Sequence, residues 1–265
     1  MRNSVHAEAI RLSATPNFPR FLLAGLATAL FLTGGLTVLG PEHMNPPMPG
    51  PDVPEGVHGL LGLLVLTAPI PVLMGASAMT TEFAHRTIIP TVLFQPRRHY
   101  VVLAKLTVMV FAGLVYGLVV AIGAVLGIFG GAWIARMDVA VPVLEVSVLA
   151  LRIGLSMAFY TVIGVGIGSL IPRPQAALIV IVGWFYLLES MLSAIPGIQH
   201  VYPWLPGGAA SAITGQNFVL DAIASATGGG GVHLLPAVAG MAVLLAYALM
   251  ASLLALSTTL RNDIR

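Results

Sequence analysis

Long apolar runs alternate with short polar segments along the whole chain. Six runs stand out, at residues 21–40, 57–79, 106–134, 143–171, 176–195 and 234–260. A helix of ~20 apolar residues crosses the ~30 Å hydrocarbon core of a bilayer. The pattern therefore predicts an all-α integral membrane protein with six transmembrane helices.

Basic residues gather on one side of these predicted spans. If both termini lie inside, the basic residues on the inner side are Arg2, Arg11, Arg20, Arg86, Arg97, Arg98, Lys105, Arg173, Arg261 and Arg265. The acidic residues of the opposite loops are Glu42, Asp52, Glu55, Asp138 and Asp221. Because an excess of Lys and Arg marks the cytoplasmic side, the sequence predicts that both termini are cytoplasmic.

Composition supports a membrane protein and excludes several other classes. Hydrophobic residues make up 57% of the chain and charged residues 8%, whereas a soluble domain carries about 25% charge. We therefore expect one membrane domain over residues 1–265. Arginine far outnumbers lysine and Ala, Gly and Val are abundant, which indicates a GC-rich bacterial genome. We accordingly expect a protein of the bacterial plasma (inner) membrane.

The same composition argues against most kinds of catalytic and metal-binding site. The absence of cysteine excludes disulfides, thiolate metal sites and cysteine nucleophiles. The histidines have no metal-ligand spacing, so we expect no metal. The basic residues are scattered along the inner face, which argues against nucleic acid as a partner.

Two segments outside the predicted spans carry apolar patterns of their own. Near the N-terminus, Val5, Ala9 and Leu12 share one face of a short helix, which predicts an interfacial helix. Residues 196–233 are apolar and contain no Lys or Arg, and we expect two short external re-entrant helices, near 208–214 and 218–226. Such backbone is tolerated at membrane depth only where protein covers it.

The chain lacks the residues that bind and hydrolyse ATP. A P-loop needs a lysine after its glycines, and the sole lysine, Lys105, follows Leu103 and Ala104. We expect no catalytic residues and no cofactor here, with any ATP bound by a partner subunit. Lys105 itself is expected to extend to the membrane interface.

Arg152 and Glu189 are the ionisable residues deepest in the apolar runs. Each charge costs roughly 2.5 to 3.5 kcal/mol or more at a helix centre, so both should face protein or water. Two interpretations stay open, a structural ion pair between neighbouring helices and a polar lining of a translocation path. Glu145, two turns from Arg152 on the same face, is a competing partner.

Glycine and proline positions within the spans predict packing and bending. Gly164, Gly166 and Gly168 favour close helix approach. They also place Ser169 in a context similar to a nucleophile turn, but the nearest later histidine lies at the opposite end of its span, which argues against an intramembrane protease. Pro69 and Pro71 predict a kink in the second span.

One polar segment carries a family resemblance. Residues 82–88 read Glu-Phe-Ala-His-Arg-Thr-Ile and are followed by Thr91, Leu93, Pro96, Arg97, Arg98, Ala104 and Lys105. This pattern resembles the cytoplasmic loop of ABC-2 type transporter permeases, which often show Glu-Phe-x-His-Gly-Thr, a short helix, Pro, a basic cluster and Ala-Lys. The segment Tyr-Pro-Trp-Leu-Pro-Gly-Gly-Ala-Ala-Ser-Ala at 202–212 looks like the stretch before that family's external re-entrant helices. Arg86 stands where the family commonly has Gly, and Arg does not take positive φ cheaply.

The resemblance implies the membrane subunit of an ABC exporter. Two permease subunits would pair, and a separate ABC-type ATPase subunit would dock under each. The docking element would be a cytoplasmic coupling helix between spans two and three, preceded in the chain by an N-terminal connecting helix. Its docking residues would be Glu82, Phe83, His85, Arg86, Thr87, Ile88, Leu93, Arg97 and Arg98.

Three other interpretations of the same sequence stay open. The polar loop could instead be solvated and held by its arginines at anionic headgroups of the membrane lipid. The chain could be a stand-alone secondary transporter, although Glu189 is essentially its only buried acid. The substrate could be lipid-like, drug-like or a lipid-linked sugar, since an apolar cavity admits all three.

Overall fold

The chain folds into a bundle of helices. The computed structural model describes residues 2–43, 47–84, 98–194, 200–215 and 234–261, and these form helices and no strands. In chain order the elements are α1 (Arg2–Ala14), α2 (Asn17–Leu30), η1 (Phe31–Gly35), α3 (Leu36–Leu39), η2 (Pro41–His43), α4 (Pro54–Gly62), η3 (Leu63–Thr67), α5 (Pro69–Ala84), α7 (Arg98–Ala135), α8 (Val143–Leu170), α9 (Pro174–Val182), η4 (Gly183–Leu188), α10 (Glu189–Ala194), η5 (Tyr202–Trp204), α11 (Pro206–Thr214) and α13 (Ala237–Arg261).

Five helices are long and apolar enough to cross a membrane. They cover Asn17–Leu39, Pro54–Ala84, Val101–Ala135, Val143–Leu170 and Ala237–Ser257. The fifth apolar run of the sequence forms a shorter apolar helix, Pro174–Leu188, which continues into α10 at Glu189. The all-helical fold is thus confirmed for the described residues, with five helices that are long and apolar enough to cross a membrane, and the sixth crossing stays a prediction.

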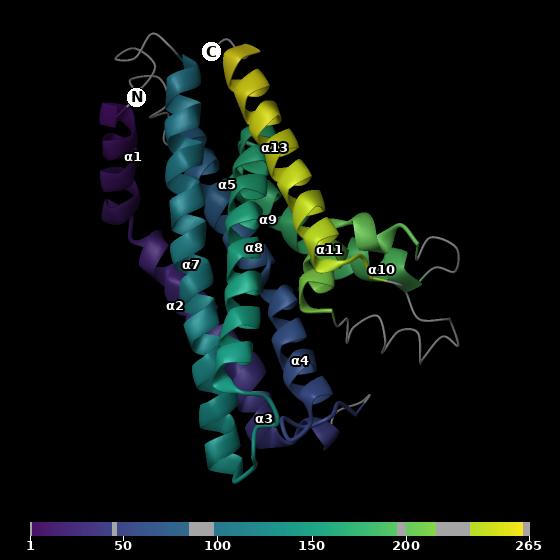
Figure 1. Ribbon diagram of the computed structural model, residues 1–265. Helices are drawn as coiled ribbons and strands as arrows, with labels where there is room; N and C mark the ends of the chain where they lie inside the picture. The colour runs from purple at the N-terminus through teal and green to yellow at the C-terminus, as the bar shows by residue number, and fades with distance from the viewer. Residues whose placement is uncertain (1, 44–46, 85–97, 195–199, 216–233, 262–265) are drawn as a thin grey trace.

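The two chain ends lie at the same end of the bundle. Figure 1 shows α1 and the C-terminal end of α13 at the top, with the turn between α7 and α8 at the bottom. We call the top the terminal end and the bottom the distal end. The end of α5 and the start of α7, which flank residues 85–97, also lie at the terminal end. The structure thus brings together both termini and the flanks of the predicted docking segment.

Helix α8 occupies the centre of the bundle and packs against α5, α7 and α13. Small residues permit these contacts: a Cβ at Gly168 would lie 2.5 Å from the Ala76 carbonyl oxygen of α5, and one at Gly166 would lie 2.5 Å from the Ala251 Cβ of α13. Gly164 likewise leaves no room for a Cβ against α5. The predicted role of these glycines in close packing is confirmed. The Ser169 hydroxyl, which the sequence placed in a context similar to a nucleophile turn, donates a hydrogen bond to the Gly166 carbonyl at 2.6 Å.

Two of the predicted spans contain irregular turns. In the second, the 3₁₀ segment η3 separates α4 from α5 directly before Pro69, which has no N–H to continue an α-helical ladder. The sequence predicted a kink at Pro69 and Pro71, and the α-helix is indeed interrupted on the N-terminal side of these prolines, by η3. In the first span, the π-helical turn η1 follows α2, and the Thr33 hydroxyl there donates to the Ala29 carbonyl at 2.8 Å.

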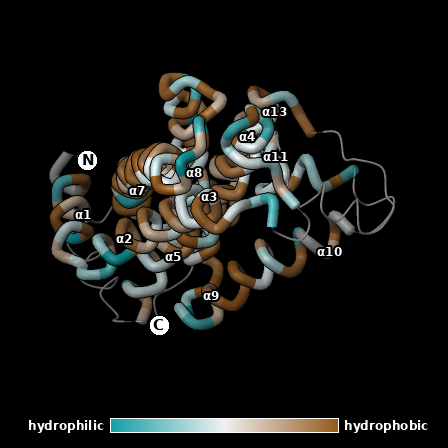
Figure 2. Tube along the Cα trace, turned by 90° about the horizontal axis from the view of Figure 1, so that it is seen from below, coloured by the Kyte–Doolittle hydropathy of each residue, from teal (hydrophilic) through white to brown (hydrophobic). Residues whose placement is uncertain are grey.

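Helices α9 and α10 lie at the periphery. Figure 2 shows them at one edge of the bundle, and the residues of α9 and of the following η4 are mostly apolar. Ile179 is 71% exposed and Leu187 63% exposed. A mostly apolar and exposed helix of this kind suits a lipid environment.

Candidate functional site: buried charges at the terminal end

Helix α1 contributes charges to the interior of the terminal end. It packs along α7, with Val5 and Leu12 half-buried against the main core. Glu8 is 9% exposed, whereas Ala9 is exposed. The predicted apolar face is therefore shifted, because the buried face of α1 includes Glu8 in place of Ala9.

Four charged side chains from three helices meet there, and we call them the ionic cluster: Glu8, Arg11, Glu82 and Lys105. The Lys105 Nζ lies 2.5 Å from Glu82 Oε1 and 3.0 Å from Glu8 Oε2. Arg11 Nη1 lies 2.5 Å from Glu82 Oε1 and 3.5 Å from Glu8 Oε1. Each carboxylate thus faces both cations.

Burial and charge balance make the ionic cluster a structural joint. Glu82 and Lys105 are each 3% exposed. Two carboxylates and two cations sum to zero, so the low-polarity interior holds no net charge. Removing one partner of a buried pair costs about 3 to 5 kcal/mol, because an uncompensated charge remains. The cluster therefore holds α1 of the N-terminus to α5 and α7.

A small polar cavity adjoins the ionic cluster. Its volume is about 60 Å³, and besides the cluster it is lined by hydroxyl and amide side chains, Thr15, Asn17, Ser77 and Thr81, and by apolar residues of α1, α2, α5 and α7. A buried water needs roughly 10 to 15 Å³ of such space and two to four polar partners. The cavity therefore has room for a few waters beside the charged side chains.

The structure describes only part of the predicted docking segment. Glu82 is buried in the ionic cluster, so its side chain is not part of an exposed docking surface. Phe83 is half-buried and packs against the main core. Arg98 begins α7, but its side chain lies outside the description. The other predicted docking residues, His85, Arg86, Thr87, Ile88, Leu93 and Arg97, lie outside the described residues.

The expectation for Lys105 was wrong. The sequence places the only lysine at the end of an apolar run, a position that favours extension to the interface. Instead the ammonium group turns inward, since Glu82 and Glu8 supply two carboxylates within 3.0 Å. Glu8 and Glu82 lie on the predicted inner side of the membrane, where most other charged residues are arginines. These two acids were the sequence signal that could have indicated the cluster.

A second buried carboxylate, Glu189, lies elsewhere in the molecule. It is 4% exposed and accepts hydrogen bonds from the Gly207 amide at 3.1 Å and the Trp184 indole at 3.2 Å. Gly207 is in the first turn of α11, where a helix presents unpaired amides and a positive dipole. The Tyr160 hydroxyl donates to the Pro206 carbonyl at 2.7 Å and fixes the same turn to α8.

Helix α11 corresponds to the first predicted re-entrant helix. It covers Pro206–Thr214, all nine residues are buried, and it packs against α13. It ends at Gly215, whose φ of 69° is left-handed. The burial expected of this segment is confirmed, and the second predicted helix, near 218–226, lies outside the described residues.

The structure does not join Arg152 to Glu189. Both belong to the described part of the chain, and no ion pair links them; Glu189 is buried against α11, while Arg152 is exposed on α8. The competing partner, Glu145, has its Oε1 3.8 Å from His58 Nε2 of α4. The Gly207 amide and the Trp184 indole hydrogen-bond to Glu189, so its partners are donors other than an arginine.

Comparison with known proteins does not identify a family for this chain. No protein-family model matches the chain. No curated protein matches it either. The functional interpretation therefore depends on the residues and on the geometry described above.

Proposed function

We propose that this chain is the membrane permease subunit of an ATP-driven exporter, in which a separate ATPase subunit binds and hydrolyses the nucleotide. The sequence from Glu82 to Lys105 supports this proposal through its resemblance to ABC-2 permeases. Five span-length helices supply the membrane body. The sixth crossing, formed by α9 to α10, belongs to the proposal.

One structural observation supports it most strongly. The ionic cluster ties α1 to the last turn of α5 and the first turns of α7, the two helices that flank residues 85–97. A force applied to that segment would therefore act on three helices at once. Such a joint would pass a partner's movement on to α1, α5 and α7 together, which supports the docking proposal.

The transport step follows from this joint. The ATPase subunits close on ATP and push on the segment between α5 and α7. Because α1 is fixed to both flanks, the terminal end moves as a unit, and the central α8 follows through its close contacts with α5 and α7. The substrate, an apolar or lipid-linked molecule, leaves between two permease subunits on the side away from the termini.

Orientation belongs to the same proposal. The termini and the flanks of residues 85–97 share one end of the bundle (Figure 1). An excess of basic residues on that side favours the cytoplasm. We therefore place the terminal end inside a bacterial plasma membrane, where ATP and the ATPase subunit are found.

The test is co-purification. An affinity-tagged chain is isolated from its native membrane in mild detergent and its partners are identified. We expect an ATP-hydrolysing subunit and a second permease subunit. The Leu93→Asp variant should lose the ATPase, because an unpaired carboxylate at an interface is costly. Its spanning helices should stay folded.

A matched control is Arg173→Gln, which removes an exposed charge after α8 and should retain the partner. A wild-type chain that transports its substrate without any ATPase would contradict the proposal and favour a secondary transporter. An unchanged ATPase yield with Leu93→Asp, together with loss on removing Arg97 and Arg98, would favour a lipid-anchored loop.

A further inference from the structure

Glu189 is a buried acid that no cation balances among the described residues. It is 4% exposed, and its two hydrogen-bond donors, the Gly207 amide at 3.1 Å and the Trp184 indole at 3.2 Å, both reach Oε1. Oε2 occupies the space that a Cβ at Gly207 would fill. An ionised carboxylate in these surroundings keeps its full negative charge inside the protein, which is costly without a countercharge.

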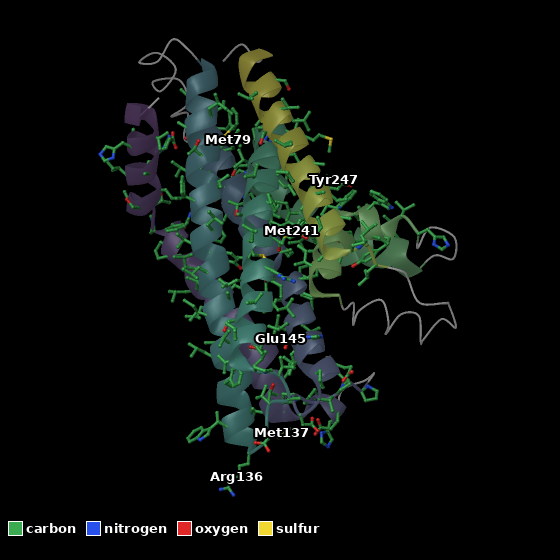
Figure 3. All side chains as sticks on the ribbon, in the orientation of Figure 1. Met79, Arg136, Met137, Glu145, Met241 and Tyr247 are labelled. Carbon is green, nitrogen blue, oxygen red and sulfur yellow. The ribbon has the colours of Figure 1, made fainter. Side chains whose placement is uncertain are left out.

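The groups that face Glu189 from the neighbouring helices are uncharged. The titratable ones are Tyr160 of α8 and Tyr247 of α13 (Figure 3), and Tyr202 of η5 lies beside Tyr160. Tyrosine has an ordinary pKa of ~10, so all three are neutral at neutral pH. Helix α11 contains no ionisable residue. These elements therefore supply no countercharge.

Opposing interactions act on the two protonation states of Glu189. Burial disfavours the ionised carboxylate, because the interior solvates charge poorly. The two N–H donors and the positive end of the α11 dipole favour it, since hydrogen bonds to an ionised acceptor are roughly twice as strong as neutral ones. Glu82 differs, because two cations favour its ionised state. At Glu189 a proton is the cation that can balance the charge.

The protonation state of Glu189 also affects how α11 is held. Among the described residues, two hydrogen bonds join the first turn of α11 to other helices. One runs from the Gly207 amide to Glu189, and the other from the Tyr160 hydroxyl to the Pro206 carbonyl at 2.7 Å. Loss of the charge on Glu189 would weaken the first bond and leave the second unchanged.

We propose that Glu189 is a proton-binding site that sets how firmly α11 is held. The proton adds to a carboxylate oxygen and forms an O–H bond, no covalent bond breaks, and the negative charge is neutralised. The hydrogen bonds from Gly207 and Trp184 then lose their charge assistance, so the first turn of α11 is held mainly by Tyr160. The site is separate from the ionic cluster and does not depend on the proposed export function.

The experiment titrates the full chain, purified in detergent, with Trp184 as the reporter. The other two tryptophans are replaced by Trp133→Phe and Trp204→Phe, and emission is followed from about pH 4 to about pH 9, below the titration of tyrosine. Hydrogen exchange of residues 206–214 is measured at the same pH values and divided by the intrinsic rate. We expect a one-proton transition in emission, and exchange about tenfold faster on its acidic side.

Three variants in the same background locate the proton. Glu189→Gln has no ionisable group, so the transition should disappear and α11 should exchange as in the acidic form. Glu189→Asp keeps a carboxylate at a changed distance from its donors and should shift the midpoint, so the test holds even if Glu189→Gln does not fold. Glu145→Gln is the matched control, since it removes a 60% exposed carboxylate of α8 (Figure 3) and should leave the midpoint unchanged.

Four results would overturn the proposal. The first is the absence of any transition when Trp184 is the only tryptophan. The second is a transition with the same midpoint in Glu189→Gln or Glu189→Asp. The third is equal exchange of α11 on both sides of the transition. The fourth is loss of the transition in Glu145→Gln, because the proton would then bind at the other acid.

Discussion

Glu82 and Glu189 are both buried carboxylates, yet the protein stabilises them in opposite ways. Glu82 is 3% exposed and faces two cations, Lys105 and Arg11, which come from other helices. Glu189 is 4% exposed and faces no cation among the described residues; its partners are the Gly207 amide and the Trp184 indole.

The difference shows what each carboxylate does for the fold. An ion pair across helices depends on long side chains from separate elements, so Glu82 joins three helices at the terminal end. Glu189 instead accepts from one amide in the first turn of α11 and from an indole, so it fixes the start of one short helix. Disturbing Glu82 should therefore loosen the bundle, and disturbing Glu189 should act locally, on α11 and on Trp184 of η4.

The largest effect is expected from Lys105→Met, which keeps the side-chain length and removes the charge. Glu82 and Glu8 would then lie buried with Arg11 alone. We expect a loss of about 3 to 5 kcal/mol in the free energy of unfolding. Thermal unfolding of the detergent-solubilised chain measures it, with Arg173→Gln as an exposed-charge control of near-zero effect.

The double variant Lys105→Met with Glu82→Gln sharpens this prediction. Removing both charges eliminates the unpaired carboxylate, so part of the lost stability should return. If the double variant were as unstable as the sum of the two single variants, Lys105 and Glu82 would not form the joint described above.

An intermediate effect is expected at Glu189. Glu189→Ala leaves the Gly207 amide and the Trp184 indole without an acceptor, which costs about 1 to 3 kcal/mol. Glu189→Gln keeps one carbonyl acceptor and should cost less. Trp184 emission should change in both variants before global unfolding. A loss as large as that of Lys105→Met would show that the two carboxylates are not stabilised differently.

The smallest effect is expected from Arg11→Gln. The Arg11 side chain is 37% exposed, so solvent screens its charge, and Lys105 stays in contact with both carboxylates. We expect a loss of up to about 1 kcal/mol. The same unfolding assay measures it, and a loss exceeding that of Lys105→Met would reverse the assigned roles of the two cations.

Sequence patterns predicted the helices and several of their irregularities. Apolar runs located the five span-length helices, because burial in lipid requires ~20 apolar residues wherever a helix crosses. Pro69 indicated the break at η3, and Gly164, Gly166 and Gly168 indicated close packing. Each of these features depends on local chemistry that a sequence displays directly.

The charged contacts could not be predicted in the same way. The cluster of Glu8 with Lys105 joins residues 97 positions apart, and no local pattern links them. Glu189 was matched with Arg152 because both lie in apolar runs, but the approach of α11 depends on the tertiary path of the chain. The pattern of side chains along a sequence does not show that a backbone amide, here that of Gly207, will be the partner of a buried carboxylate.

A double-mutant cycle between Glu8 of α1 and Lys105 of α7 tests most directly whether buried charges fix the N-terminal helix to the bundle. The free energy of unfolding is measured for wild type, Glu8→Gln, Lys105→Met and the double variant. We predict a coupling energy of about 1 to 3 kcal/mol, with the double variant less damaged than the sum of the single variants. A coupling energy of zero within error would contradict the joint, and with it the structural support for a docking segment between α5 and α7.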